Sequence, residues 1–212
     1  MRIALINGSP KVKESTSAII LKDLESLLGG QELLSVELHK ACITEEQLAL
    51  ILNCDTLVFA FPLYVDGIPS HLLAVLEAIE EGAHKLQGDG KKRMVYTMVN
   101  CGFYESEQNN IALEIMQHFA KRAGFHYGQG VGFGAGGMIA SLGNVPLGHG
   151  PKRNYGNALV ELADHIKKGQ SGDTLYPKMN FPRFLYQQAA QLGMKKSAKQ
   201  NGCKRRDLDK RL

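Results

Sequence analysis

The sequence has no tryptophan, no Cys-x-x-Cys pair and no apolar run that approaches the ~18 residues of a membrane span. Its cysteines are widely scattered, at Cys42, Cys54, Cys101 and Cys203. This scatter argues against an iron–sulfur cluster, a zinc site or a disulfide framework. The first residues lead straight into an apolar segment and lack the layout of a signal peptide, so we expect a cytoplasmic protein.

A consistent excess of charge is also missing from most of the chain. The net charge of +4 arises from residues 195–212, where eight Lys and Arg stand against two Asp and Glu, while the other residues hold 17 basic and 19 acidic side chains. A basic tail is most often a solvated terminus. Because this tail has no interleaved aromatic residues of the kind that stack on bases, we expect no specific nucleic-acid binding.

What the chain does contain is a regular alternation of two kinds of segment. Short apolar runs, typical of buried parallel strands, lie at 3–6, 33–38, 55–61, 94–99 and 127–135. The segments between them carry apolar residues at helical spacing, and Thr44 is placed to cap one of these helices. This alternation predicts an α/β fold with a doubly wound, five-stranded parallel sheet.

The composition changes after the last predicted helix of this pattern, at 155–168, which follows a glycine-rich connection at 143–156. We therefore predict one domain at 1–170 and a C-terminal extension at 171–212. The extension contains an amphipathic helix followed by the basic tail, and the apolar stripe of this helix consists of Phe181, Phe184, Leu185, Ala189 and Leu192. Three positions for the stripe are open: packed on the domain, packed on a dimer mate, or in transient contact with a membrane surface.

A hydroxyl-rich loop follows the first predicted strand and leads into a helix. It contains Ser9, Ser15, Thr16 and Ser17. The free N–H groups and the dipole of a helix N-terminus suit a phosphate. The loop has neither Gly-x-Gly-x-x-Gly nor Gly-Lys-Ser/Thr, which argues against a standard dinucleotide fold and a triphosphate P-loop. Two interpretations remain open: a phosphate site, or an ordinary N-cap at Ser15 or Thr16 beside an ordinary turn.

Two more loops follow predicted strands. Residues 62–69 contain two prolines and a glycine, which prevent a regular element, and residues 100–106 follow the fourth strand. Ligands of doubly wound sheets bind beyond the carboxyl ends of the strands, near the point where the strand order reverses. In the strand order 2-1-3-4-5, the ends of strands one, three and four lie side by side. The three loops are therefore predicted to converge.

These loops resemble those of the flavodoxin-like NAD(P)H-dependent FMN reductases. Residues 6–11, followed by Ser15 and Thr16, resemble the family's FMN-phosphate loop, which commonly reads Gly-Ser-Pro-Arg followed by Asn-Thr. Residues 61–69 resemble the loop in which Pro-x-Tyr lies against the isoalloxazine ring, and residues 100–103 resemble the third flavin loop. The resemblance covers residues 1–170. Lys11 replaces the common Arg and Ser15 the common Asn, and the cysteine cluster of the related iron–sulfur flavoproteins is absent.

The resemblance implies a flavodoxin-like fold, noncovalent FMN, NADH or NADPH as co-substrate, a small-molecule electron acceptor and a homodimer. It places the FMN phosphate against Ser9, Lys11, Ser15, Thr16 and Ser17. It places the flavin ring between two further groups of residues: Pro62, Leu63, Tyr64 and Val65 on one side, and Asn100, Cys101, Gly102 and Phe103 on the other. No catalytic side chain is implied, because a flavin carries its own redox chemistry.

The function that agrees best with these residues is an FMN-dependent NAD(P)H oxidoreductase that passes electrons to a flavin, a quinone or a similar small acceptor. One alternative is a flavodoxin-type electron carrier without its own substrate. Such carriers tend to be strongly acidic and to place Trp or Tyr against the flavin, whereas this chain has no Trp and is close to neutral outside its tail. The other alternative is a non-enzymatic flavin-binding regulatory protein, which the fold does not exclude.

Overall fold

The computed structural model describes residues 1–86, 90–203 and 207. Contacts divide the chain into two compact units, Met1–Met179 and Asn180–Leu212. Residues 171–179, which the composition assigns to the extension, therefore belong to the first unit. Eight residues of the predicted basic tail at 195–212, namely 204–206 and 208–212, lie outside the described residues.

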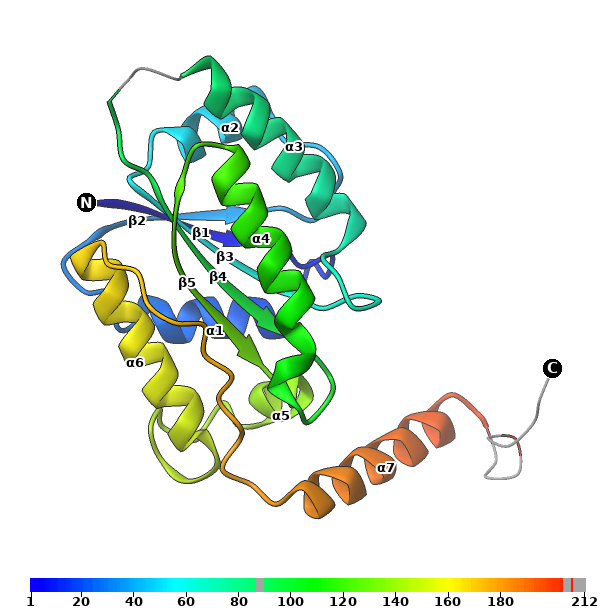
Figure 1. The fold of residues 1–212 in the computed structure, drawn as a ribbon. Helices are drawn as coiled ribbons and strands as arrows, with labels where there is room; N and C mark the ends of the chain where they lie inside the picture. Colours follow the sequence, from blue (N-terminus) through cyan, green and yellow to red (C-terminus); the bar gives the residue numbers. More distant parts are fainter. Residues whose placement is uncertain (87–89, 204–206, 208–212) are drawn as a thin grey trace. The chain divides into compact units, whose positions relative to one another are not determined.

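A parallel sheet of five strands, in the order β2-β1-β3-β4-β5, forms the centre of the first unit (Figure 1). The strands are β1 (Arg2–Asn7), β2 (Glu32–Glu37), β3 (Thr56–Pro62), β4 (Met94–Asn100) and β5 (His126–Phe133). The inner strands β1, β3 and β4 are buried along almost their whole length, because helices cover both faces of the sheet. The order and direction of the strands confirm the predicted flavodoxin-like, doubly wound fold.

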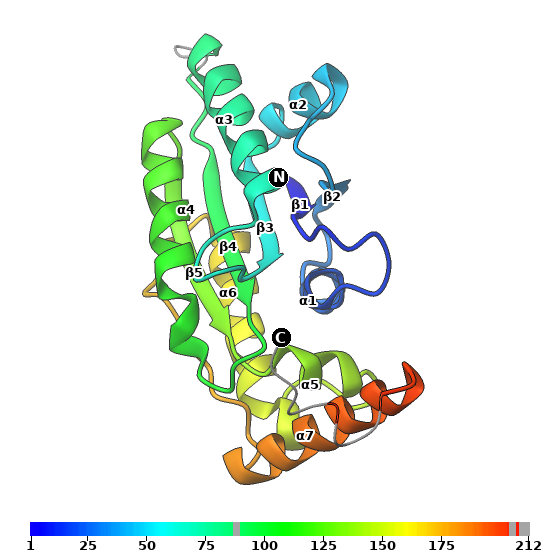
Figure 2. The ribbon, with the colours of Figure 1, turned by 90° about the vertical axis from the view of Figure 1, so that its right-hand side faces the viewer.

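Helices lie on both faces of this sheet, as Figures 1 and 2 show. One face carries α1 (Thr16–Glu25) and α6 (Arg153–Lys168), and the other carries α2 (Glu45–Leu52), α3 (Ser70–Lys85) and α4 (Asn110–Arg122). A short helix, α5 (Gly136–Ser141), follows β5 in a segment where the sequence predicted no helix. Two 3₁₀ turns, Ser106–Asn109 and Gly150–Lys152, precede α4 and α6.

Side chains on β3 and β4 show how the two faces are filled. Phe59 packs edge-on against Phe119 of α4, with ring centroids 6.0 Å apart. On the opposite face, the buried Tyr96 donates its hydroxyl to the carbonyl oxygens of His165 and Gln170, at 3.1 and 2.8 Å. Burial raises the pKa of this phenol to about 12. Alternating strand positions thus anchor helices on both sides of the sheet.

The chain beyond α6 returns along the outer edge of the sheet. The N–H of Gly172 donates to Gly128, the N–H of Leu175 donates to Gly130, and the N–H of Gly132 donates to Leu175, each at 2.9 to 3.0 Å. These bonds pair the segment with β5 and explain why it belongs to the first unit. The second unit contains α7 (Arg183–Gln200). None of the helices in the described part of the chain combines the length and apolar character needed to cross a bilayer.

Candidate functional site

The three predicted loops meet at the carboxyl ends of β1, β3 and β4. The N–H of Gly8 donates to the carbonyl oxygen of Ala60 at 2.8 Å, which joins the first loop to β3. The N–H of Leu63 donates to the carbonyl oxygen of Asn100, also at 2.8 Å, which joins the second loop to the third. The hydroxyl of Ser17 donates to Oδ1 of Asn100 at 2.8 Å and joins the start of α1 to the end of β4. The predicted convergence of the loops is therefore confirmed.

The first loop is shaped by the buried side chain of Asn7, the last residue of β1. Its Oδ1 accepts the N–H of Ser9 at 3.1 Å, and the Ser9 hydroxyl accepts the N–H of Lys11 at 3.3 Å. These two short-range bonds close a tight turn after the strand. The buried Ser9 is part of the turn itself, whereas Lys11 is exposed at its surface.

The hydroxyls at the start of α1 take part in the protein's own hydrogen bonds. Ser15 is the N-cap, and its Oγ accepts the N–H of Ala18 at 3.1 Å. Thr16 donates to the carbonyl oxygen of Gly136 at 3.4 Å, and Ser17 is held by Asn100. The N-cap interpretation of Ser15 is therefore confirmed. Because a helix leaves four N–H groups without intrahelical partners and this cap uses one, the helix start retains the capacity to bind an anion. Phosphate contacts by Ser9, Lys11, Ser15, Thr16 and Ser17 stay predictions.

The second loop contains a small hairpin after Pro62. Tyr64 and Gly67 exchange both backbone hydrogen bonds at 3.0 Å. The two residues between them, Val65 and Asp66, have φ values of 47° and 57°, a left-handed conformation that is costly for a β-branched residue such as Val65. The hairpin leaves Tyr64 half-exposed and Val65 fully exposed beside the strand ends. Flavin contacts by Pro62, Leu63, Tyr64 and Val65 stay predictions.

The third loop presents an exposed aromatic residue and hides a thiol. Phe103 is 56% exposed, whereas Asn100 and Cys101 are buried. The Cys101 sulfur lies 3.5 Å from Nδ2 of Asn109, and burial is the main cause that raises the pKa of its thiol. A buried thiol with a raised pKa is neutral and inert. Any contact of Cys101 with a ligand would thus come from its backbone, and the contacts predicted for Asn100, Cys101, Gly102 and Phe103 stay predictions.

A fourth segment, which the sequence did not mark as part of the site, lies against the third loop. The N–H of Gly136 donates to the carbonyl oxygen of Cys101 at 2.8 Å, and the N–H of Ala135 donates to that of Phe103. Ala135 adopts φ 53°, and a Cβ on Gly136 would lie 3.0 Å from the Cys101 oxygen. Glycines such as those at 134 and 136 are typical of close contact between two backbone segments, but the sequence alone does not identify the second segment.

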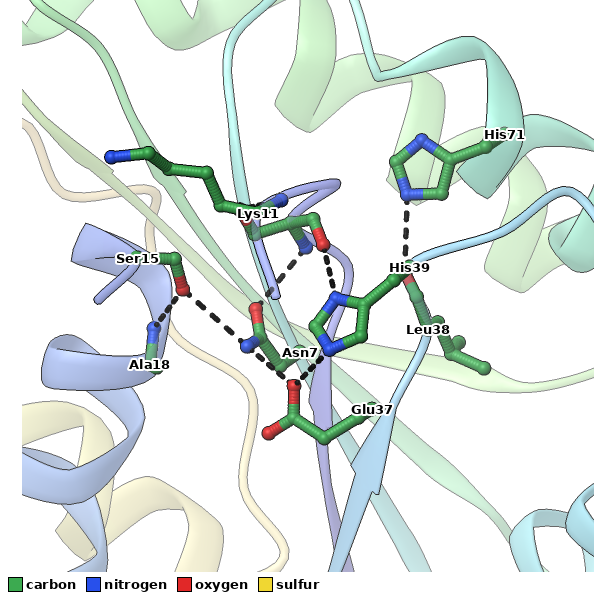
Figure 3. A network of polar contacts seen from close by, with 9 residues as sticks. Asn7, Lys11, Ser15, Ala18, Glu37, Leu38, His39 and His71 are labelled. Carbon is green, nitrogen blue, oxygen red and sulfur yellow. Dashed lines mark hydrogen bonds and ion pairs between the residues drawn. The ribbon is translucent and has the colours of Figure 1, made fainter. Parts of the chain in front are cut away.

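The sequence also did not identify Glu37 and His39, which lie at the end of β2, beside the first loop. Oε2 of Glu37 accepts from Nδ2 of Asn7 at 2.7 Å and lies 3.2 Å from Nε2 of His39. Figure 3 shows these side chains beside Ser15, and the Lys11 side chain leading away from them. The sequence offered one indication of this hydrogen-bond network, namely the polar Asn7 at the end of the apolar run 3–6.

No protein-family model matches the sequence, and no curated protein matches it. Solved structures of similar fold include an NADH:FMN oxidoreductase in its apo form, with 16% identity, a TM-score of 0.62, and coverage of 86% of this chain and 96% of that one. An NADPH-quinone reductase from P. pentosaceus has 15% identity, a TM-score of 0.52, and coverage of 68% and 95%. A mutant flavodoxin from Pseudomonas aeruginosa has 14% identity, a TM-score of 0.53, and coverage of 79% and 99%. At these identities the likeness establishes the fold alone.

Proposed function

We propose that this protein is an FMN-dependent NAD(P)H oxidoreductase that passes electrons to a small acceptor such as a flavin or a quinone. The observation that carries the proposal is the junction at Asn100. Its carbonyl oxygen holds the loop after β3 and its side chain holds the start of α1, so a helix N-terminus and two loops with exposed aromatic residues share one edge of the sheet. Two of the similar folds belong to proteins described as an NADH:FMN oxidoreductase and an NADPH-quinone reductase.

The chemistry of these residues suits a phosphorylated flavin. The N-terminus of α1 offers backbone N–H groups and the positive end of a helix dipole, and Lys11 adds an exposed cation. Tyr64 and Phe103, 48% and 56% exposed, are aromatic surfaces on which a ring can pack. When bound, FMN would supply the hydride and electron transfer. The residues of the chain would bind the phosphate, orient the ring and exclude water.

The alternatives are separated by charge and composition rather than by fold. A flavodoxin shares the fold, so the fold does not decide between an enzyme and an electron carrier. The near-neutral body of the chain and its lack of Trp favour the enzyme. A non-enzymatic flavin-binding protein would bind FMN without accepting electrons from either nicotinamide.

Anaerobic reduction of the purified protein tests the proposal. We expect a yellow protein, or a colourless one that reconstitutes with FMN, whose flavin absorbance bleaches with NADH or NADPH. Tyr64→Ala and Phe103→Ala should each weaken FMN binding about fivefold, because each removes a ring contact worth about 1 kcal/mol. Leu86→Ala, which truncates an exposed apolar side chain at the C-cap of α3, is the control and should leave the affinity unchanged.

Each alternative has its own outcome in this experiment. Failure to bind FMN would remove the central claim. A flavin that binds but is bleached by neither nucleotide would identify the carrier or the regulatory protein. The homodimer implied by the resemblance is measured by sedimentation equilibrium on the same sample, and the cytoplasmic location stays a prediction.

For the extension, we propose that α7 makes transient contact with an anionic membrane surface. The helix contains no Asp or Glu, ends with Lys195, Lys196 and Lys199, and buries none of its residues. At 100° per residue, Phe184 and Leu192 share a face with Lys195 and Lys199. The apolar side chains of this stripe could enter the interface, while the long lysine side chains extend their ammonium groups to acidic headgroups.

Co-sedimentation of the full chain with phosphatidylcholine vesicles, with and without phosphatidylglycerol, tests this contact. Each Lys near an anionic surface contributes about 1 kcal/mol, so we expect anionic lipid to raise binding more than tenfold at low salt. Leu192→Asp should abolish binding, whereas Ile111→Asp, a matched change on α4, should not. Equal binding to neutral vesicles, or none to either kind, would contradict the proposal.

A further inference from the structure

The imidazole of His39 links the first loop to the end of β2. Its Nδ1 lies 2.7 Å from the carbonyl oxygen of Ser9, and its Nε2 lies 3.2 Å from Oε2 of Glu37. Its side chain is 19% exposed. Figure 3 shows the ring between the loop and the Glu37 carboxylate. Both ring nitrogens therefore face an oxygen atom.

These two neighbours determine which form of the ring makes both contacts. A carbonyl oxygen and an ionised carboxylate only accept hydrogen bonds, and a neutral imidazole has a single N–H. The neutral ring can satisfy one of these neighbours, whereas the imidazolium satisfies both. A charge-assisted bond to a carboxylate is also about twice as strong as a neutral one.

The same ring completes a closed set of bonds around Ser9. Asn7 accepts the N–H of Ser9 at 3.1 Å and donates to Glu37 at 2.7 Å, and Glu37 pairs with His39, which holds the Ser9 carbonyl. Asn7 also donates to the Ser15 hydroxyl at 3.4 Å. Both peptide groups of Ser9 are thus fixed from β1 and β2, together with the N-cap of α1.

We propose that His39, as an imidazolium paired with Glu37, is a positioning residue that holds the Ser9 turn in the shape that receives the phosphate of a flavin. This inference rests on the function proposed above. Loss of the proton removes one of the two bonds and one positive charge beside the loop. Histidine exchanges its proton between about pH 5 and 8, so loss of the proton should weaken binding of a phosphorylated flavin. Riboflavin has no phosphate, and its affinity should not change with this proton.

The other charged or titratable groups near this ring come from three elements. Glu37 approaches from β2, and the Lys11 side chain of the loop leads away from the network (Figure 3). Lys40 follows His39 in the chain. His71 of α3 places its Nε2 3.1 Å from the carbonyl oxygen of Leu38. Because that single acceptor is satisfied by a neutral ring with a proton on Nε2, His71 provides a matched control histidine.

The test compares FMN affinity in the wild type and in His39→Gln from pH 5.5 to 8.5, measured by flavin fluorescence. The second proton of a phosphate monoester leaves at about pH 6, so the ratio of the two affinities is used to cancel that effect. We expect His39→Gln to bind FMN about tenfold more weakly at pH 6, because the turn that receives the phosphate loses about one charge-assisted hydrogen bond that orders it. The ratio of the two affinities should fall toward one at pH 8.5. Riboflavin should give a flat ratio, and His71→Gln should match the wild type.

The protonation state is measured separately by long-range ¹⁵N NMR of the histidine side chains in the full chain. We expect the His39 ring to carry protons on both nitrogens at pH 6. A neutral ring at that pH, or an FMN affinity ratio of one at every pH while thermal melting shows that His39→Gln is folded, would overturn the proposal. If no flavin binds at any pH, the proposed function fails together with the phosphate role, and the NMR result still decides the imidazolium.

Discussion

Replacing Gly134 with alanine is expected to destabilise the protein by about 3 kcal/mol and to displace the third loop of the site. A Cβ at this position would overlap the carbonyl oxygen of Tyr104, and it would lie 2.9 Å from the carbon of that group and 3.0 Å from the Ser106 nitrogen. All three are backbone atoms, which cannot rotate away as the end of a side chain can. The segments at 101–106 and 134–136 must therefore move apart, with loss of the bonds that hold Cys101 and Phe103.

Gly137→Ala is the matched control for this change. Gly137 lies three residues further on, in α5, and a Cβ there would meet nothing within 4 Å. Because alanine favours helix over glycine by up to about 1 kcal/mol, this variant should be as stable as the wild type or slightly more stable. Urea denaturation measures both changes. Equal stability of the two variants would show that the 101–106 loop adjusts without cost.

The second large effect is expected at Asp23, whose removal should cost about 3 kcal/mol of folding free energy. Its Oδ2 accepts from the ammonium of Lys152 at 3.0 Å and from the hydroxyl of Tyr155 at 2.8 Å. The Lys152 side chain is only 3% exposed, so Asp23→Ala leaves a buried cation without its counter-charge. Burial is the main cause that raises the pKa of Tyr155, with the Asp23 carboxylate as a second cause, so this phenol stays protonated and cannot replace the lost charge.

An exposed ion pair on the same molecule supplies the control. Asp164 lies 3.1 Å from Lys167, with both side chains well exposed, and pairs of this kind contribute less than about 1 kcal/mol. Asp164→Ala should therefore leave the urea midpoint nearly unchanged. Adding Lys152→Met to Asp23→Ala removes the unpaired charge and should restore much of the lost stability. A double variant no more stable than Asp23→Ala alone would show that buried charge is not the cause.

The Asp23 cluster also affects the site through the chain connection. Lys152 ends the segment that leads from α5 to α6, and its contact with Asp23 attaches that segment to α1. The same α5 supplies Gly136, whose carbonyl oxygen accepts from Thr16 at the start of α1. Loss of Asp23 should therefore lower FMN affinity as well as stability.

The sequence by itself predicted the five strands, the helices between them and the place of the candidate site. The apolar runs of β3 and β4 identify buried parallel strands, and Thr44 caps α2 in a reciprocal arrangement with Gln47. These signals are local, because burial of a strand and capping of a helix depend on residues close together in the chain. Given the flavodoxin-like strand order, which the structure has, the meeting of the three loops follows from topology.

Only the tertiary structure decided which atoms of those loops could contact a ligand and which residues fix the loops in place. Ser17 donates its hydroxyl to Asn100, 83 residues away, and the thiol of Cys101 points inward. Both side chains are therefore held by the protein itself, although their position after a strand predicted contact with a ligand. His39 meets Ser9 across 30 residues, and Gly136 meets Thr16 across 120. Such contacts have no local pattern, because they depend on how β2 and β5 are placed beside the inner strands. Chain order thus placed the candidate site at one edge of the sheet, and packing between distant segments determined its shape and its charge.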